Sequence, residues 1–115
     1  MYSVFIILNK LSKLDEILKV FYDNGCGATT VNSEGLAHTL CNTNNNIPIF
    51  AGLRSLFQDD EPNNITIMSV IEEEKKLREI VDTIKPKFDR ERIGIMFVSP
   101  VLEAYGVHNK EYDNY

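Results

Sequence analysis

Residues 64–85, NITIMSVIEEEKKLREIVDTIK, set a strand directly before an amphipathic helix, and this succession decides the fold class. NITIMSVI alternates residue types at period two, which predicts a β-strand. In residues 72–85 acidic residues occupy the first turn and Lys85 the last, and Pro86 follows, in agreement with the helix dipole and with the usual stop signals. We therefore expect a helix that ends before the proline. Its apolar face consists of Leu77, Ile80, Val81 and Ile84.

A similar strand and helix stand at the start of the chain. MYSVFIIL, residues 1–8, is short and rich in β-branched and aromatic residues, which predicts a largely buried strand. LSKLDEILKVFYDNG, residues 11–25, predicts an amphipathic helix that Gly25 closes. Ser12 is a suitable N-cap, with Asp15 at the capping-box position. The apolar face of this helix consists of Leu11, Leu14, Ile17, Leu18 and Phe21.

Two further strands complete the pattern. GATTVNSEGLAHTL, residues 27–40, predicts a strand that Gly35 kinks or bulges and that ends near Leu40. IMFVSPV, residues 95–101, predicts a last strand, in which Pro100 is best tolerated at the end or at a sheet edge. The order of elements is therefore strand, helix, strand, long connection, strand, helix, strand.

This order favours an α+β fold in which two helices cover one face of a four-stranded antiparallel sheet. It is the ferredoxin-like βαββαβ sandwich, here with a long loop between the second and third strands. We expect a single domain in residues 1–108, with residues 41–64 as a loop insertion and residues 109–115 as a disordered tail. One sheet face would remain open, and the apolar residues that we assign to it predict a symmetric oligomer formed through the sheet. They are Val4, Ile6, Thr30, Ile65, Ile67 and Phe97.

Composition excludes several classes of protein. The 115 residues carry a formal net charge of −5, whereas a protein that mainly holds nucleic acid needs a basic surface. The N-terminus lacks the basic region and cleavage site of a signal peptide, and no apolar run approaches the roughly 20 residues of a membrane span. We therefore expect a cytoplasmic protein that is not embedded in a membrane.

The residues suited to metal binding or catalysis are few. Cys26 and Cys41 lack the paired spacing of a zinc site, so we interpret them as buried or incidental thiols, and we interpret His38 and His108 as scattered histidines. There is no nucleophile elbow, no Walker-type glycine loop and no pair of metal-binding histidines. The sequence therefore predicts neither a metal site nor catalytic residues, and we expect a protein that is not an enzyme.

Three stretches together resemble the P-II nitrogen-regulatory signalling proteins. YSVFIILNKLSKLDEILKVFYDNGCGATTV, residues 2–31, is similar to the first half of that family, with LDE opening the first helix and a Thr-Val strand after the closing glycine. Residues 64–85 take the place of its third strand and second helix. GIMFVSPVLEAYGV, residues 94–107, is similar to its Gly-Lys-Ile-Phe-Val-x-Pro-Val segment. The resemblance covers most of residues 2–107.

The resemblance implies a homotrimer whose clefts between subunits bind a small effector, an adenine nucleotide in this family, and whose long loop docks on a transporter or an enzyme. Residues 35–39 stand at the loop base that contacts nucleotide, and residues 90–94 take the place of a glycine-rich phosphate-binding loop. The ligand-binding residues that it implies are Thr30, Gly35, His38, Thr39, Arg90, Arg92 and Gly94.

This chain departs from the family in three places. Ile95 replaces the lysine that follows the last glycine of the phosphate-binding loop, and the two arginines that follow the last strand in the family fall near Gly106 and His108. Residues 41–64 contain no tyrosine, so the family's regulation by uridylylation is not expected. Two interpretations of KFDRER, residues 87–92, stay open: its arginines substitute as phosphate donors, or the run is a solvated charged loop.

The long loop contains IPIFAGLRSLF, residues 47–57, which is too apolar for a disordered segment. Its apolar residues follow helical spacing, and two interpretations remain. The short helix either covers the cleft mouth or a sheet edge of its own oligomer, or it docks on a partner protein. The residues concerned are Ile49, Phe50, Leu53, Arg54, Leu56 and Phe57.

An alternative class of function is a metal-binding trimer resembling the divalent-cation tolerance proteins, or a module of similar topology that senses a small metabolite. Clustering of Cys26, Cys41 and His38 would favour the metal-binding trimer. A basic ligand cleft would favour the signalling protein.

Overall fold

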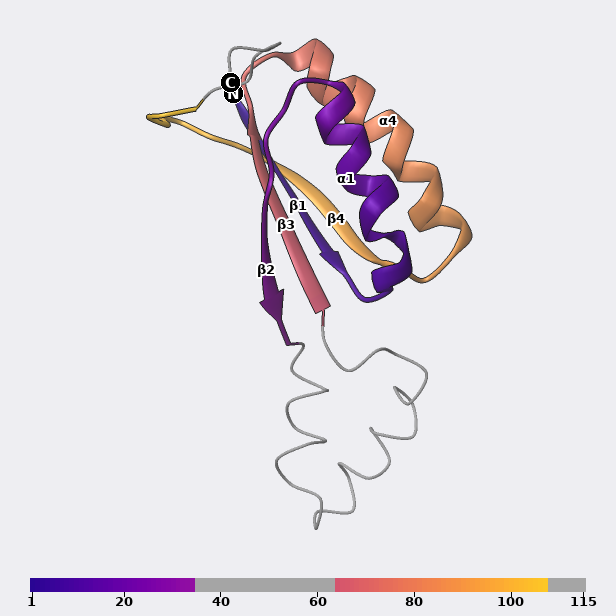
Figure 1. Cartoon of the computed structure of the whole chain (residues 1–115). Helices are drawn as coiled ribbons and strands as arrows, with labels where there is room; N and C mark the ends of the chain where they lie inside the picture. Colours follow the sequence, from indigo (N-terminus) through magenta and orange to yellow (C-terminus); the bar gives the residue numbers. More distant parts are fainter. Residues whose placement is uncertain (35–63, 108–115) are drawn as a thin grey trace.

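The computed structural model of the chain describes residues 1–34 and 64–107. They form one antiparallel sheet with the strand order β2-β3-β1-β4, and two α-helices cover one of its faces (Figure 1). The four-stranded α+β ferredoxin-like fold is thereby confirmed. The elements are β1 (Tyr2–Leu8), η1 (Leu11–Lys13), α1 (Leu14–Asp23), β2 (Thr29–Ser33), β3 (Asn64–Ile71), α4 (Glu74–Arg90) and β4 (Gly94–Pro100).

The hydrophobic core lies between the sheet and the helices. β1 is central, and its alternate residues Val4, Ile6 and Leu8 are fully buried under the helices. The apolar faces expected for the helices supply the opposite layer, except that Leu11 is exposed. The core consists of Val4, Ile6, Leu8, Ile17, Phe21, Cys26, Ile67, Ile71, Leu77, Ile80, Val81, Ile84 and Ile93.

The first helix begins later than expected and ends as expected. The 3₁₀ turn η1 precedes α1 and contains Ser12, so the prediction of Ser12 as N-cap is wrong, and α1 begins without a side-chain cap. After the helix, Gly25 has a φ of 70° and donates its N–H to the carbonyl of Tyr22. The N–H of Cys26 donates to the carbonyl of Phe21 at 2.9 Å. This pair of bonds is a Schellman motif, which satisfies carbonyls that the helix end leaves free.

The second helix runs through the proline that was expected to stop it. α4 contains Pro86 and continues to Arg90. A proline inside a helix removes one hydrogen bond and crowds the preceding turn, at a cost of about 3 kcal/mol. The extra turn is held by tertiary contacts, because Phe88 packs against the core and Lys87 pairs with Glu16 at 3.1 Å. The charged run KFDRER, for which a solvated loop was one interpretation, therefore begins inside the helix.

The assignment of residues to the open face is wrong for Val4, Ile6, Thr30, Ile65 and Ile67, and right for Phe97. The register places the first five on the side of the helices, where Ile6 lies opposite Ile67 and both are fully buried. Phe97 lies on the other face, opposite Phe5. Because β1 is apolar on both faces, residue alternation alone did not decide which face the helices cover.

Part of the expected organisation lies outside the described residues. β2 ends at Ser33, and the expected continuation to Leu40, the loop insertion up to residue 63 and the tail at 109–115 are among the residues that are not described. In residues 1–34 and 64–107, no helix has the length and apolar character needed to cross a membrane.

Candidate functional site

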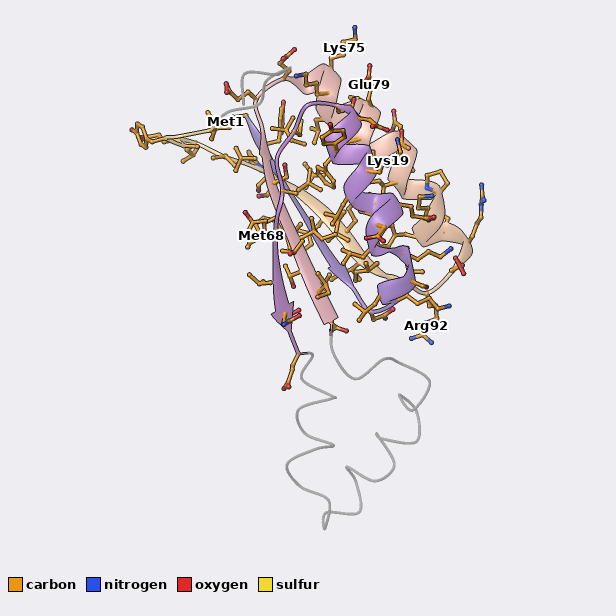
Figure 2. All side chains as sticks on the ribbon, in the orientation of Figure 1. Met1, Lys19, Met68, Lys75, Glu79 and Arg92 are labelled. Carbon is orange, nitrogen blue, oxygen red and sulfur yellow. The ribbon has the colours of Figure 1, made fainter. Side chains whose placement is uncertain are left out.

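Two connections that the resemblance implicates in ligand binding meet the sheet at the same end. They are the connection from β2 to β3 and the connection from α4 to β4. Ser33 at the end of β2 pairs with Asn64 at the start of β3, so residues 34–63 leave and re-enter the sheet at this end. Leu8 lies opposite both Ile65 and Gly94, so the connection from α4 to β4 enters the sheet at the same end. Figure 1 shows this arrangement, and Figure 2 shows the labelled Arg92 there.

The described ligand-binding candidates are not all close to one another. Arg90 is the last residue of α4, Arg92 lies in the connection and Gly94 begins β4, so these three are neighbours. Thr30 lies on β2, at the opposite edge of the sheet from β4. Three strand spacings separate the two edges, or about 14 Å. A single protomer therefore does not bring Thr30 to the arginines. Gly35, His38, Thr39 and the candidates in residues 47–57 lie outside the described residues.

The connection from α4 to β4 is held in a defined conformation. Ile93 is fully buried, and its carbonyl accepts a hydrogen bond from the N–H of Asn9 at 2.8 Å. Gly94 has a φ of 144°, and a Cβ atom at this position would lie 1.9 Å from the carbonyl oxygen of Ile7. A glycine is therefore needed here for the close contact between β4 and β1, whatever else the connection does.

Ion pairs hold the same connection from outside. The Glu91 carboxylate lies 3.1 Å from the Lys13 ammonium and 3.9 Å from that of Lys10. Glu16 lies within 4.0 Å of Lys13 and 3.1 Å from Lys87, so the chain of charges joins α4 to the start of α1. The hydrogen bond and the charge of Lys13 lower the pKa of Glu91. The sequence alone did not predict this role of Glu91, because its partners Lys10 and Lys13 come from a separate segment of the chain.

Arg90 and Arg92 are exposed, and neither forms an ion pair with any residue in the described part of the chain. They flank Glu91, which the lysines hold. Two guanidinium groups, one at the end of α4 and one on the connection that follows it, can act as donors to an anionic ligand, since guanidinium binds phosphate and carboxylate through paired hydrogen bonds.

The open face of the sheet is a second candidate surface. We call it the open face, and it consists of Ser3, Phe5, Ile7, Thr29, Val31, Ser33, Asn64, Thr66, Met68, Val70, Ile95, Phe97 and Ser99. None of these residues carries a charge. Figure 2 shows Met68 on this side, away from the helices.

The open face combines an apolar centre with paired hydroxyl groups. The rings of Phe5 and Phe97 are stacked, with 5.0 Å between their centroids. The hydroxyls of Ser3 and Ser99 lie 3.0 Å apart, near one end of the strands. Those of Ser33 and Thr66 lie 2.8 Å apart, near the other end. Because these hydroxyls already have partners within the chain, burial of the face would not leave them without hydrogen bonds.

Cys26 is buried in the core. This agrees with the interpretation of the cysteines as buried thiols. Burial raises the pKa of its thiol, and its sulfur lies 3.6 Å from the carbonyl oxygen of Asn24. A buried thiol with a raised pKa is a poor source of thiolate. Cys41, His38 and His108 lie outside the described residues.

No model of a known protein family matches this chain, and no curated protein matches it. The resemblance to the P-II proteins stays a prediction that the quoted residues alone carry.

Proposed function

We propose that this chain is a non-catalytic, P-II-like regulatory protein. It forms a homotrimer through the open face, binds a small anionic effector of the adenine-nucleotide class between subunits, and controls a partner protein through residues 41–64. The observation that carries this proposal is the uncharged open face of a ferredoxin-like sheet, with its apolar centre. The expected cytoplasmic location belongs to the same proposal.

The open face supports subunit association on energetic grounds. Phe97 and Ile95 are 46% and 57% exposed, and Val31 on the same face is 44% exposed. Each square ångström of apolar surface removed from water contributes about 25 cal/mol. Chains with a net charge of −5 repel one another at long range, so a contact between copies is favoured where the surface is neutral.

The separation of the candidate ligand residues supports a site between subunits. Thr30 and Arg92 belong to opposite edges of one sheet, and a cyclic arrangement of copies brings the β2 edge of one protomer toward the β4 edge of the next. The long connection leaves the β2 edge at the same end of the sheet as the arginines, so in this arrangement a ligand bound between subunits would contact the base of the neighbouring copy's connection. This relation would couple effector binding to residues 41–64.

The experiment combines multi-angle light scattering with thermal unfolding in the presence of ATP, ADP and AMP. We expect the mass of a trimer and a rise in the unfolding temperature, because a ligand at about 100 times its Kd adds about 2.7 kcal/mol of stability. The double variant R90A/R92A should lose the nucleotide effect and stay trimeric. Arg78→Ala, which removes an exposed arginine near the N-terminal end of α4, is the matched control.

A monomer at all concentrations would overturn the trimer. A temperature shift that is absent at millimolar nucleotide, or that is equal in R90A/R92A and the parent protein, would overturn nucleotide binding at the arginines. Divalent metal ions in the same assay test the metal-binding alternative.

A further inference from the structure

The segment after β4 projects from the sheet as an arm. We call residues 101–107 the C-terminal arm. Figure 1 shows it extending away from the body on the side opposite the helices. Its base is held by the N–H of Val101, which donates to the carbonyl of Met1 at 3.0 Å. The arm therefore starts from a fixed point at the edge of the open face.

The arm exposes two large side chains. Leu102 is 94% exposed and Tyr105 is 87% exposed, more than any other large hydrophobic residue of the described chain. The Tyr105 hydroxyl donates a hydrogen bond to Glu103, which orients the ring without covering it. An apolar side chain and an aromatic ring presented together in this way are typical anchors of a protein contact.

The open face by itself is a small interface. Four strands about 4.8 Å apart and seven residues with a rise of about 3.4 Å give a footprint of roughly 450 Å². A stable interface typically buries about 800 Å² on each partner. Association through the face therefore needs further contacts from outside the sheet, and among the described residues the arm is an exposed segment that borders the face.

We propose that the C-terminal arm of one copy packs on the open face of the next copy, with Leu102 and Tyr105 as its anchors. The inference rests on the proposed association through the open face. Every copy carries both an arm and a face, so the contact is heterologous, and three such contacts would close the proposed trimer into a ring. The face suits these anchors because its centre is apolar, because it carries no charge, and because four of its hydroxyls are already paired.

The test uses sedimentation velocity on the full chain and on variants. L102S/Y105S removes both anchors, and Tyr22→Ser is the matched control, since Tyr22 is 82% exposed but lies on α1. We expect L102S/Y105S to raise the concentration of half-dissociation at least roughly tenfold, and Tyr22→Ser to leave it unchanged. Far-UV circular dichroism should be the same for all three proteins, because the arm contributes nothing to the core.

Mixing two defective chains tests the location of the contact. Val31→Glu places a charge on the open face at β2, the strand farthest from the base of the arm. A mixture of Val31→Glu with L102S/Y105S should form a 1:1 complex, because the intact arm of the first meets the intact face of the second.

The outcomes separate the two proposals. If the parent protein assembles and L102S/Y105S assembles equally well, the arm proposal is wrong and the trimer stands. Absence of a complex in the mixture also overturns the arm proposal. If the parent protein is monomeric at every concentration, the association through the face and the arm proposal both fail.

Discussion

Phe5 and Phe97 stack across β1 and β4 on the open face, with ring centroids 5.0 Å apart and planes inclined by 16°. Phe97 nevertheless remains 46% exposed. The pair therefore stabilises the junction of two strands and at the same time presents an aromatic surface. Aromatic pairs contribute about 0.5–1.5 kcal/mol beyond area burial.

Phe97→Lys is expected to dissociate the proposed trimer, because it places a charge in the centre of an uncharged interface. The monomer should lose only about 1 kcal/mol of folding stability, the contribution of the aromatic pair. Light scattering gives the mass and urea denaturation gives the stability. Tyr22→Lys, a substitution at an exposed aromatic residue on α1, should change neither. A trimeric Phe97→Lys protein would contradict the prediction.

Gly94→Ala is expected to reduce the free energy of unfolding by about 3 kcal/mol or more. The new Cβ would lie 1.9 Å from the carbonyl oxygen of Ile7, and the φ of 144° disfavours a side chain in any case. Urea denaturation measures the loss. Gly27→Ala is the control, because a Cβ at that position has no atom within 4 Å. Equal stability of the two variants would show that β4 does not approach β1 as described.

Pro86→Ala is expected to stabilise the protein. The alanine supplies the N–H that α4 lacks in its interior, which raises the free energy of unfolding by up to about 3 kcal/mol. The unfolded chain gains conformational freedom when the proline is removed, and this reduces the gain by about 0.4–1 kcal/mol. Thermal and urea unfolding at neutral pH measure the net change, which we expect to be a gain of up to about 2–2.6 kcal/mol. A loss of stability would mean that the helix stops at the proline.

Acid is expected to weaken the ion pairs of Glu91 that hold the connection between α4 and β4. Lys13 lowers the folded-state pKa of Glu91 from its ordinary value of 4.5. The stability that this carboxylate contributes is therefore fully present above about pH 4.5, and it is lost as the pH falls through the lower folded-state pKa. Glu91→Gln should flatten the dependence of unfolding free energy on pH below this value, and added salt should have a similar effect on the parent protein.

The control for the acid effect is Glu79→Gln. Glu79 is an exposed residue of α4 whose side chain forms no ion pair with the described residues. Its variant should keep the parental pH dependence. If the unfolding free energy depends on pH in the same way in Glu91→Gln and in the parent protein, the ion pairs of Glu91 do not stabilise the connection.

Deletion of residues 47–57, with a short Gly-Ser replacement, distinguishes the two interpretations of IPIFAGLRSLF. If the segment packs on its own oligomer, the deletion should lower the unfolding temperature or raise the concentration of half-dissociation. If it is a docking element, both quantities should equal those of the parent protein. A matched variant that replaces only Ile49, Phe50 and Leu53 by serine separates the loss of apolar contacts from the change in loop length.

Local patterns in the sequence predicted much of the fold. Alternation in residues 64–71 matched β3 at both ends, and Gly25 marked the end of α1 through its positive φ. The order of these elements then predicted a ferredoxin-like sheet, because short connections and two helices leave few ways to cover its face. Of the candidate site, the sequence indicated Arg90 and Arg92 but not Glu91, whose partners lie far away along the chain.

The sequence by itself determined which segments are strands and helices, since periodicity and turn chemistry act over a few residues. Only the tertiary structure decided which face of β1 is buried, because Val4 and Phe5 are both apolar and contact with the helices selects between them. It also decided that α4 continues past Pro86, because packing of Phe88 against the core outweighs a local stop signal. Long-range contacts thus decide which face of a strand is buried and where a helix ends when local propensity does not.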